Sequence, residues 1–332
     1  MKDKEGPATD TAENRSPLGI ALDIVDDEEQ RRTRIAWLYY IEGRTQAEIG
    51  HLLGISRARV VRDLQLARET GLVQIRINGR LAPCVAQERK LTEAYGLLDC
   101  LVLPTPIDQE HLPATLGMAL GHWLSDRIRP GRTLGIGWGR TLYWSVRALR
   151  RQKVEDLTVV SLLGGVGRGL EINTYETASR LAEKLGAQCY YLAAPTFASS
   201  ARMRDMLIHQ PPIAEVLDRA RSADLAIASV GELSPRATNR RLGLVRAEEQ
   251  QALRELGATG DLLGTFLDAE GRPVDHPINR RVVGLPLEDF RRLPVRVLAS
   301  GGDHKVPAVR SVLRGGYVNV LITDIRTAAA VL

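Results

Sequence analysis

The chain of 332 residues has few cysteines and histidines, and their spacing excludes several classes of site. Cys84, Cys100 and Cys189 are odd in number and far apart, so they form neither a disulfide framework nor a zinc-binding CxxC pair. The six histidines are scattered, without the HxxxH spacing of a metal site. We therefore expect reduced cysteines, no structural metal and no cofactor.

Long hydrophobic runs are also missing. No apolar segment approaches the ~20 residues of a membrane span, and the N-terminus lacks the apolar core of a secretion signal. We therefore expect a cytoplasmic protein without membrane contact. A composition of 44% hydrophobic and 26% charged residues is typical of globular domains, and the length allows two of them.

Residues 45–70 follow the pattern of a helix-turn-helix motif. Thr45 and Glu48 form a Thr-x-x-Glu capping box, Gly54 suits the turn, and Ser56 can cap the second helix. The apolar residues at helical spacing are Ile49, Leu52 and Leu53, then Val60, Leu64 and Ala67. The spacing predicts two short packed helices.

The second helix would present arginines to DNA. At 100° per residue, Arg59 and Arg62 lie away from the apolar stripe, and arginine can bond guanine bidentately in the major groove. Residues 31–80 contain ten arginines and four carboxylates. The predicted DNA-binding residues are Thr45, Gln46, Ser56, Arg57, Arg59 and Arg62, with Thr45, Gln46 and Arg57 best suited to phosphates. An ordinary helical hairpin with a solvated basic face is the alternative.

The remaining pattern divides the chain. A helix over about 28–42 would pack on the motif, and the alternating segment 72–78 predicts a strand, one arm of a wing. The expected segments are a flexible tail over 1–27, a DNA-binding domain over 28–80, a linker or dimerisation helix over 81–97, and an effector domain over 98–332.

From residue 99 onward, short apolar segments alternate with amphipathic ones, which predicts a doubly wound, mainly parallel α/β sheet. Ligands bind such sheets beyond the carboxyl ends of the strands. The predicted strands are 101–103, 133–137, 157–163, 189–193, 225–230, 295–299 and 318–323. The predicted helices are 111–127, 142–150, 174–185, 247–256 and 306–313.

The first strand-end loop of interest, GIGWGRT, runs from a strand into a helix at residues 135–141. Gly137 and Gly139 would let backbone N–H groups approach an anion at the helix start. Arg140 can pair with phosphate, and Thr141 can cap the helix or donate its hydroxyl. The loop is not GxGxxG, so no dinucleotide is predicted. A plain tight turn is the alternative.

A second glycine loop, GGVGRG, follows the next strand. It includes Gly164 and Gly165, and Arg168 could contact an anion. Asn173 could cap the next helix or bond a sugar hydroxyl. We predict that this loop contributes to the same ligand site.

Two further strand-end loops contain charged residues. Asp268 could accept hydrogen bonds from a polyol, with a simple turn aspartate as the alternative. Lys305 lies at a helix start, against the preference of the helix dipole, which suggests an anionic ligand. A solvent-exposed lysine is the alternative there. Together the four loops suit a small, oxygen-rich, phosphorylated compound.

The ordered motifs resemble the SorC family of bacterial transcriptional regulators. They include YYIEGRTQAEIGHLLGISRARVVRDLQLARETGLVQIRI, GIGWGRTL, SLLGGVGRG, GATGDLLGTFLDAEG and ASGGDHKVPAVRSVLRGG. The resemblance covers about residues 31–332 and implies an effector domain akin to sugar-phosphate isomerases, operator DNA as partner and a tetrameric homo-oligomer. It also implies effector contacts by Gly137, Gly139, Arg140, Thr141, Gly164, Gly165, Asp268 and Lys305.

The leading hypothesis is therefore a regulator of a sugar or polyol catabolic operon, controlled by a sugar phosphate, sugar or polyol of the erythritol or sorbitol type. A sugar-phosphate isomerase or deaminase with an added DNA module is the alternative, with Asp268, Asp303 and His304 as possible acid–base groups. A third hypothesis is a DNA-binding architectural protein whose α/β part only oligomerises. The sequence leaves the effector, the operator and the sign of regulation open.

Overall fold

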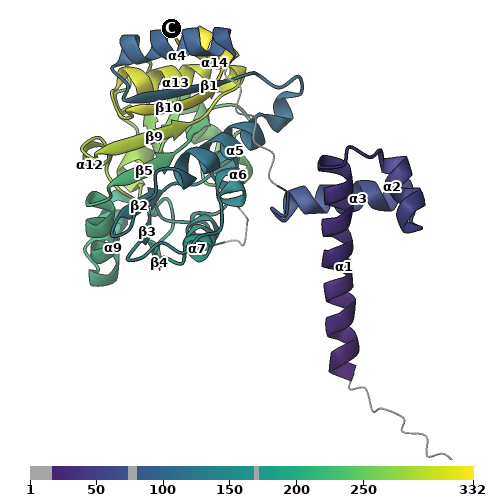
Figure 1. Cartoon of the computed structure of the whole chain (residues 1–332). Coiled ribbons are helices and arrows are strands. Elements are labelled where there is room, and N and C mark those ends of the chain that lie inside the picture. The colour runs from purple at the N-terminus through teal and green to yellow at the C-terminus, as the bar shows by residue number, and fades with distance from the viewer. Residues whose placement is uncertain (1–16, 74–80, 168–171) are drawn as a thin grey trace, which may run out of the picture. The chain divides into compact units, whose positions relative to one another are not determined.

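The computed structural model describes residues 17–73, 81–167 and 172–332 (Figure 1). The chain divides into a small unit, residues 1–77, and a large unit, residues 78–332. Most of the strand predicted over 72–78 lies outside the described residues, and so does Arg168. No helix in the described part of the chain is both long and apolar enough to cross a membrane.

The small unit contains the predicted helix-turn-helix. Its helices are α1 (Pro17–Tyr40), α2 (Gln46–Leu53) and α3 (Arg57–Glu69). The hydroxyl of Thr45 accepts from the Glu48 backbone N–H at 3.3 Å while the Glu48 carboxylate accepts from the Thr45 N–H at 2.8 Å, which confirms the capping box. Gly54 ends α2 with φ 64°, and Ser56 caps α3.

The core of the small unit follows the predicted apolar stripes, with one difference. Ile35, Ile49, Val60 and Leu64 are buried together, but Leu52 is 60% exposed and does not belong to the apolar face assigned to it. Helix α1 begins at Pro17, so the last residues of the segment expected as a flexible tail over 1–27 are helical. The predicted end of the tail therefore lies too far along the chain.

The large unit is built on a parallel sheet, as predicted. Seven strands of the described residues form it, in the order β1-β10-β9-β5-β2-β3-β4. Their bounds are β1 Asp99–Leu103, β2 Thr133–Ile136, β3 Thr158–Ser161, β4 Gln188–Tyr190, β5 Leu225–Ala228, β9 Val295–Ala299 and β10 Val320–Asp324. Each neighbouring pair is parallel, so all carboxyl ends share one edge.

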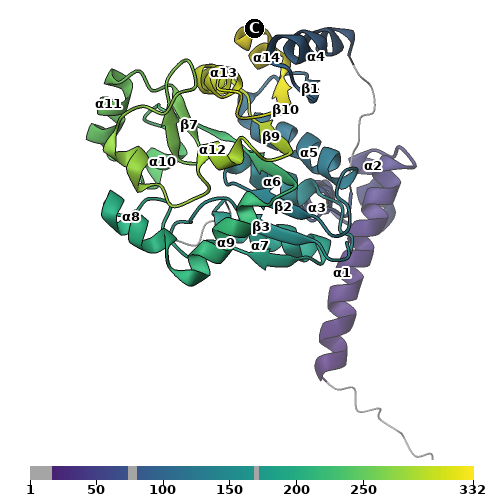
Figure 2. The ribbon, with the colours of Figure 1, turned by 90° about the vertical axis from the view of Figure 1, so that its left-hand side faces the viewer.

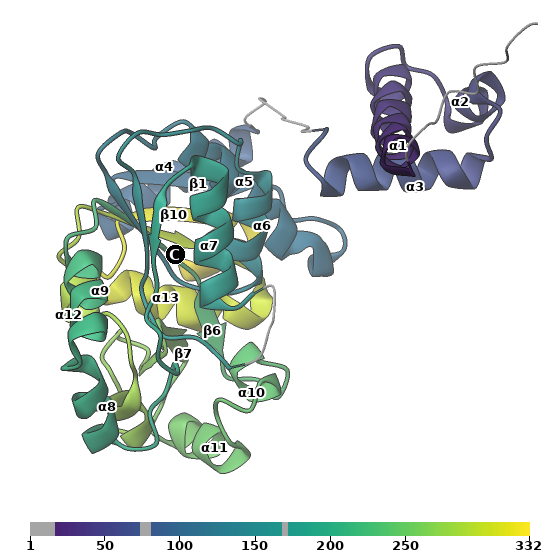
Figure 3. The same cartoon turned by 90° about the horizontal axis from the view of Figure 1, so that it is seen from below.

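Helices cover both faces of the sheet and create two apolar cores (Figure 1, Figure 3). One face carries α5, α6 and α7, which lie side by side in Figure 3. Side chains of α4, α9, α12, α13 and α14 pack in the other core. Their bounds are α4 Ala82–Tyr95, α5 Leu112–Ser125, α6 Arg140–Ala148, α7 Thr174–Leu185, α9 Pro211–Arg221, α12 Leu287–Phe290, α13 Val306–Arg314 and α14 Ile325–Val331.

A small antiparallel sheet, absent from the sequence prediction, adds to the large unit. Its strands, in spatial order, are β6 (Val230–Glu232), β7 (Gly260–Leu262) and β8 (Thr265–Leu267). A small apolar core of its own includes the side chain of Phe266. Figure 2 shows β7 beside α10 (Thr238–Arg241) and α11 (Ala247–Glu255). The remaining elements are α8 Ala201–Ile208 and the 3₁₀ turns η1 Gln109–His111, η2 Pro277–Arg281 and η3 Asp303–Lys305.

Helix α4 occupies most of the predicted linker at residues 81–97, and it packs on the large unit. Cys84 and Leu91 are buried in the core of that unit. The Glu88 carboxylate accepts a hydrogen bond from the Val102 N–H of β1 at 3.0 Å. The helix is therefore part of the large unit, and the boundary between the two units lies before it, after Ile77.

Candidate functional site

The predicted anion loop lies where β2 leads into α6. The Gly137 N–H donates to the Ile227 carbonyl at 2.9 Å, which fixes the loop against β5. Gly139 is the N-cap of α6, with φ 122° and open space where a side chain would be. Among the described residues no side chain caps this helix, so its first N–H groups can bind an anion.

Arg140 and Thr141 begin α6 in different environments. Arg140 is exposed, and within the described ranges its guanidinium has no hydrogen-bond or ion-pair partner. Thr141 is buried at the second helical position, so its predicted capping role is wrong because Gly139 takes that position. The other predicted role of Thr141, donation of its hydroxyl to a ligand, stays a prediction.

The described part of the second glycine loop, residues 164–167, packs against other parts of the large unit. A side chain at Gly164 would collide with the backbone of Ala194 and Pro195, so close packing explains this glycine. The Asn173 side chain bonds both N–H and C=O of Val166, at 3.2 and 2.9 Å. Asn173 occupies the predicted N-cap position of α7, but its side chain makes no capping bond to that helix.

Gly165 and Asp268 are likewise hydrogen-bonded within the protein. The Gly165 N–H donates to the Ala194 carbonyl at 2.9 Å. The Asp268 carboxylate accepts from Arg272, at 2.8 Å from its N–H and 3.0 Å from its side chain. Burial raises the pKa of Asp268, but these hydrogen bonds outweigh burial and hold the pKa below its ordinary value. The turn-aspartate alternative therefore describes this residue, and among the described residues no hydrogen bond or ion pair joins it to the anion loop.

Lys305 lies in η3, directly before α13, after the carboxyl end of β9. It is half-buried, and among described residues its ammonium has no hydrogen-bond or ion-pair partner. Burial lowers its pKa, and the nearby charges of Asp261, Glu232 and Arg140 also affect it. The fold thus places Arg140 near enough for its charge to act on Lys305, while the shared anion site stays a prediction.

Asp261 in β7 was missed by the sequence prediction. Its carboxylate is buried and accepts from the Asn239 side chain at 2.7 Å and the Gly264 N–H at 3.0 Å. Burial raises its pKa to about 6, against the opposing effects of those bonds and of Lys305. The signal in the sequence was a lone carboxylate within the apolar stretch 258–267. We define the strand-end cluster as Gly139, Arg140, Glu232, Asp261 and Lys305.

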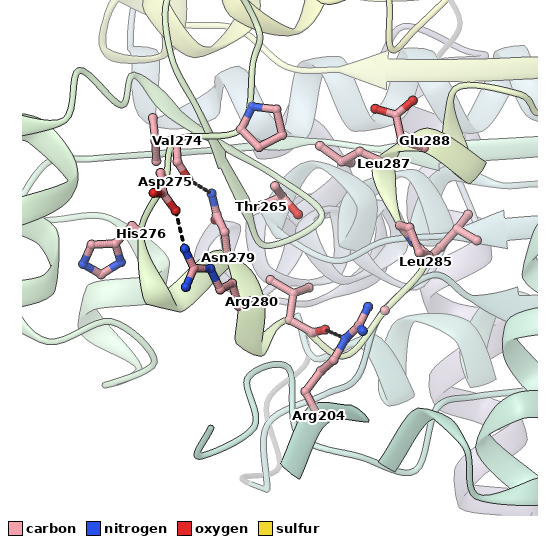
Figure 4. A pocket seen from close by; sticks show the side chains of 14 residues that line it. Arg204, Thr265, Val274, Asp275, His276, Asn279, Arg280, Leu285, Leu287 and Glu288 are labelled. Atoms are coloured by element: carbon pink, nitrogen blue, oxygen red, sulfur yellow. Dashed lines mark hydrogen bonds and ion pairs between the residues drawn. The ribbon is translucent and has the colours of Figure 1, made fainter. Parts of the chain in front are cut away.

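A separate cavity of about 400 Å³ lies away from this cluster, beside β8 and η2 (Figure 4). None of its lining residues belongs to the strand-end cluster. Its arginines are already engaged: Arg280 pairs with Asp275 at 2.6 Å, and Arg204 donates to the Val282 carbonyl at 3.3 Å. The cavity therefore offers no free cation for a phosphate.

The predicted DNA-binding residues surround the starts of α2 and α3. Arg57 donates to Gln46 at 3.4 Å, and both line a surface hollow that also includes Arg44 and Thr45. The hydroxyls of Thr45 and Ser56 serve as helix caps. This arrangement places basic groups next to two helix N-termini, which suits phosphate contacts.

The two arginines expected in the major groove differ in their surroundings. Arg62 is exposed, and its side chain has no partner among the residues that the structure describes. Arg59 is half-buried and bonds Glu28 of α1 at 2.9 Å and Asp63 of α3 at 3.4 Å. Sequence geometry placed both side chains on the same outer face and could not foresee that α1 would engage one of them.

Comparisons with known proteins cover both units. The Sugar-bind family, a sugar-binding domain, matches residues 80–332. The chain is 34% identical to the erythritol catabolism regulatory protein EryD of Brucella abortus (strain 2308), over 93% of this chain and 98% of that protein. It is also 34% identical to the transcriptional regulator LsrR of Klebsiella pneumoniae, over 97% of both chains. The full-length sorbitol operon regulator SorC from Klebsiella pneumoniae shares the fold, with a TM-score of 0.68 and 24% identity over 92% of this chain and 98% of that chain.

Proposed function

Because the chain belongs to the SorC-type family of transcriptional regulators with a sugar-binding domain, we propose that it couples DNA binding by α2 and α3 to ligand binding at the strand-end cluster. The relatives are regulators, and this favours a regulator over a sugar-phosphate isomerase or deaminase. The regulated genes would serve the catabolism of a sugar or polyol.

One observation carries the choice of ligand: Arg140 and Lys305 are brought together, and neither has a partner among described side chains. Two cations beside the uncapped start of α6 suit a phosphate group. Glu232 and Asp261 lie close enough to affect Lys305, and their oxygens suit sugar or polyol hydroxyls. We therefore propose a sugar phosphate or polyol phosphate.

The second glycine loop stays part of this proposal as a wall of the site, because the Gly164 and Gly165 N–H groups already donate to the Val283 and Ala194 carbonyls. Gly164 and Gly165 follow the carboxyl end of β3, next in the sheet to the β2 end that carries Gly137. Thr141 would donate its hydroxyl to the bound phosphate. Asp268 keeps its turn role, and Asp261 takes the carboxylate position in the proposed site.

On the DNA side, we propose that Thr45, Gln46, Ser56 and Arg57 lie along phosphates while α3 enters the major groove. The capped helix starts and the basic hollow support this arrangement. The ligand can change DNA affinity only if it binds one conformational state of the protein more tightly than the other.

The name of EryD makes erythritol and its phosphate the first ligands to test, followed by sorbitol, hexose and pentose phosphates. Thermal unfolding of the full chain with each compound should show stabilisation by a phosphorylated ligand and less by its free form. Product analysis of the same mixtures tests the enzyme alternative. Stabilisation without turnover supports the regulator, and turnover, or no stabilisation by any compound, contradicts the proposed site.

We further propose that the protein acts in the cytoplasm as a homo-tetramer. A regulator of this kind reads paired half-sites, and paired DNA-binding units satisfy that requirement. Sedimentation of the full chain, with and without the stabilising ligand, measures the assembly. A monomer at micromolar concentration in both conditions would contradict the tetramer.

A further inference from the structure

Helix α3 carries two arginines one turn apart that have opposite environments. Arg62 is exposed and has no partner among the described residues, whereas Arg59 is part of a cluster of four charged side chains. We define the α1–α3 clamp as Glu28 and Arg31 of α1 with Arg59 and Asp63 of α3. It contains two cations and two carboxylates and therefore carries no net charge.

The contacts of the clamp join the two helices at both carboxylates. Glu28 Oε1 lies 2.9 Å from Arg59 Nη2 and 3.3 Å from Arg31 Nη2. Asp63 Oδ2 lies 3.4 Å from Arg59 Nε and 3.5 Å from Arg31 Nε. Each carboxylate thus contacts one arginine from each helix, so the cluster fixes where α3 lies on α1.

Burial decides how firmly Arg59 is held. The Asp63 side chain is only 2% exposed, although it belongs to the helix proposed to enter DNA. A buried carboxylate that loses a cationic partner is destabilising, because water cannot replace that partner. If Arg59 turned toward DNA, Asp63 would keep only the longer contact with Arg31. The fold therefore opposes release of Arg59 to the groove.

We propose that Arg59 is a positioning residue that fixes α3 on α1, and that Arg62 is the specificity-determining arginine of the recognition helix. The inference rests on the proposed reading of DNA by α3. It changes the role expected for Arg59, which then supplies neither a base contact nor a free charge to the DNA. The exposed guanidinium of Arg62 is free to reach a base edge.

The test uses the full chain and a duplex that the unmodified protein selects from a random-sequence library, with a scrambled duplex of equal length. Arg62→Gln should lower the ratio of selected to scrambled affinity by about tenfold or more, because a bidentate arginine–guanine contact is lost. Its thermal midpoint should stay unchanged. Arg59→Gln should lower the midpoint of the small unit while this ratio and the salt dependence of binding stay unchanged.

A milder variant tests the clamp from its other side and avoids loss of folding. Glu28 is 51% exposed, so Glu28→Gln removes its ion pairs with Arg31 and Arg59 without burying a new group. The variant should lower the thermal midpoint of the small unit. At a temperature where circular dichroism shows the variant to be folded, its affinity for both duplexes should stay within about twofold of the unmodified protein. Glu29→Gln, an exposed neighbour on α1, is the matched control and should change neither quantity.

The outcomes separate the two proposals. If Arg59→Gln lowers the affinity ratio as much as Arg62→Gln, or if Glu28→Gln tightens binding to both duplexes, Arg59 reaches DNA and the inference is wrong. If the protein selects no duplex, or if Arg62→Gln and Arg57→Gln together leave selected binding unchanged, the reading by α3 itself fails.

Discussion

Each unit of the protein contains carboxylates close to cations, and the two clusters satisfy their charges in opposite ways. In the α1–α3 clamp, hydrogen bonds from Arg31 and then Arg59 lower the pKa of Glu28. In the strand-end cluster, burial raises the pKa of Asp261 to about 6. The first cluster is complete within the fold, whereas Arg140 and Lys305 in the second have no side-chain partner among described residues.

This difference teaches that the position of a cation in the sequence does not reveal whether it is available. Arg59 lies on the outer face of a recognition helix, yet the clamp engages it. Lys305 is half-buried beside apolar elements, yet it has no ion-pair partner in the described part of the chain. The charges of the α1–α3 clamp pair with one another, whereas in the proposed site Lys305 would pair with the ligand.

The largest expected effect concerns pH and Asp261. Below pH ~4 the carboxyl is protonated in both states, and above pH ~6 the folded protein holds an ionised buried group. The contribution of Asp261 to stability therefore falls as pH rises from about 4 to about 6. The change is on the order of 3 kcal/mol, since one pKa unit corresponds to about 1.4 kcal/mol.

Denaturant unfolding of the unmodified protein and Asp261→Asn at several pH values measures this. The stability of the unmodified protein relative to the variant should decline across that interval, whatever the constant offset between them. Parallel curves would mean that Asp261 titrates normally and that the two clusters do not differ as described.

Replacing Lys305 should affect ligand binding more than folding. Lys305→Met should weaken binding of a stabilising phosphorylated ligand by about 2 kcal/mol, roughly thirtyfold, because a charge-assisted bond to phosphate is lost. Calorimetric titration measures the affinity, and binding of the selected duplex without ligand should be unchanged. Arg151→Ala is the control, because its cation pairs with Glu183 at 3.6 Å far along the chain from the cluster. Equal affinity in Lys305→Met and the unmodified protein would remove Lys305 from the site.

Adding a side chain at Gly231, next to Asp261, should change the free energy of unfolding slightly less than Lys305→Met changes the free energy of ligand binding. A Cβ at Gly231 would collide with the Asp261 carboxylate, so Gly231→Ala should destabilise the large unit by about 1–2 kcal/mol through overpacking. Gly167→Ala, where a Cβ meets nothing within 4 Å, is the control and should stay within about 0.5 kcal/mol. Equal midpoints for the two variants would show that the carboxylate can move aside freely.

The smallest effect is expected from the clamp. Asp63→Asn should destabilise the small unit by about 1 kcal/mol, because Arg31 and Arg59 keep Glu28 as a partner. Ligand-induced stabilisation of the large unit should not change. Unfolding followed by circular dichroism, with and without the stabilising ligand, separates the two units, because the proposed ligand should shift the midpoint of the large unit alone. A loss of ligand response in this variant would mean that the clusters are coupled.

Local sequence signals predicted much of the fold. Capping at Thr45 and Ser56 and the turn at Gly54 rest on contacts between near neighbours, and the structure confirms them. The predicted helix over 174–185 agrees with α7, and the strand over 295–299 agrees with β9. The antiparallel sheet escaped prediction because its three-residue strands give too little alternation to detect.

The candidate site was predictable only where one loop supplies the geometry. Gly139 and Arg140 follow directly from a strand-to-helix turn. The proposed role of Asp261 in place of Asp268 could not be foreseen, since burial and a long-range bond from Asn239 set the surroundings of Asp261. The partners of Arg59 likewise depend on α1, whose contact with α3 spans thirty-one residues of sequence.

The position of β1 at the sheet edge has a consequence for synthesis on the ribosome. Its only neighbour in the described sheet is β10, from Val320 to Asp324, about 220 residues later. At roughly 5–20 residues per second, β1 and the adjoining α4 wait about 10–45 s for that neighbour. The helix-turn-helix closes early through local contacts. A nascent chain therefore carries a folded small unit well before the sheet of the large unit is complete.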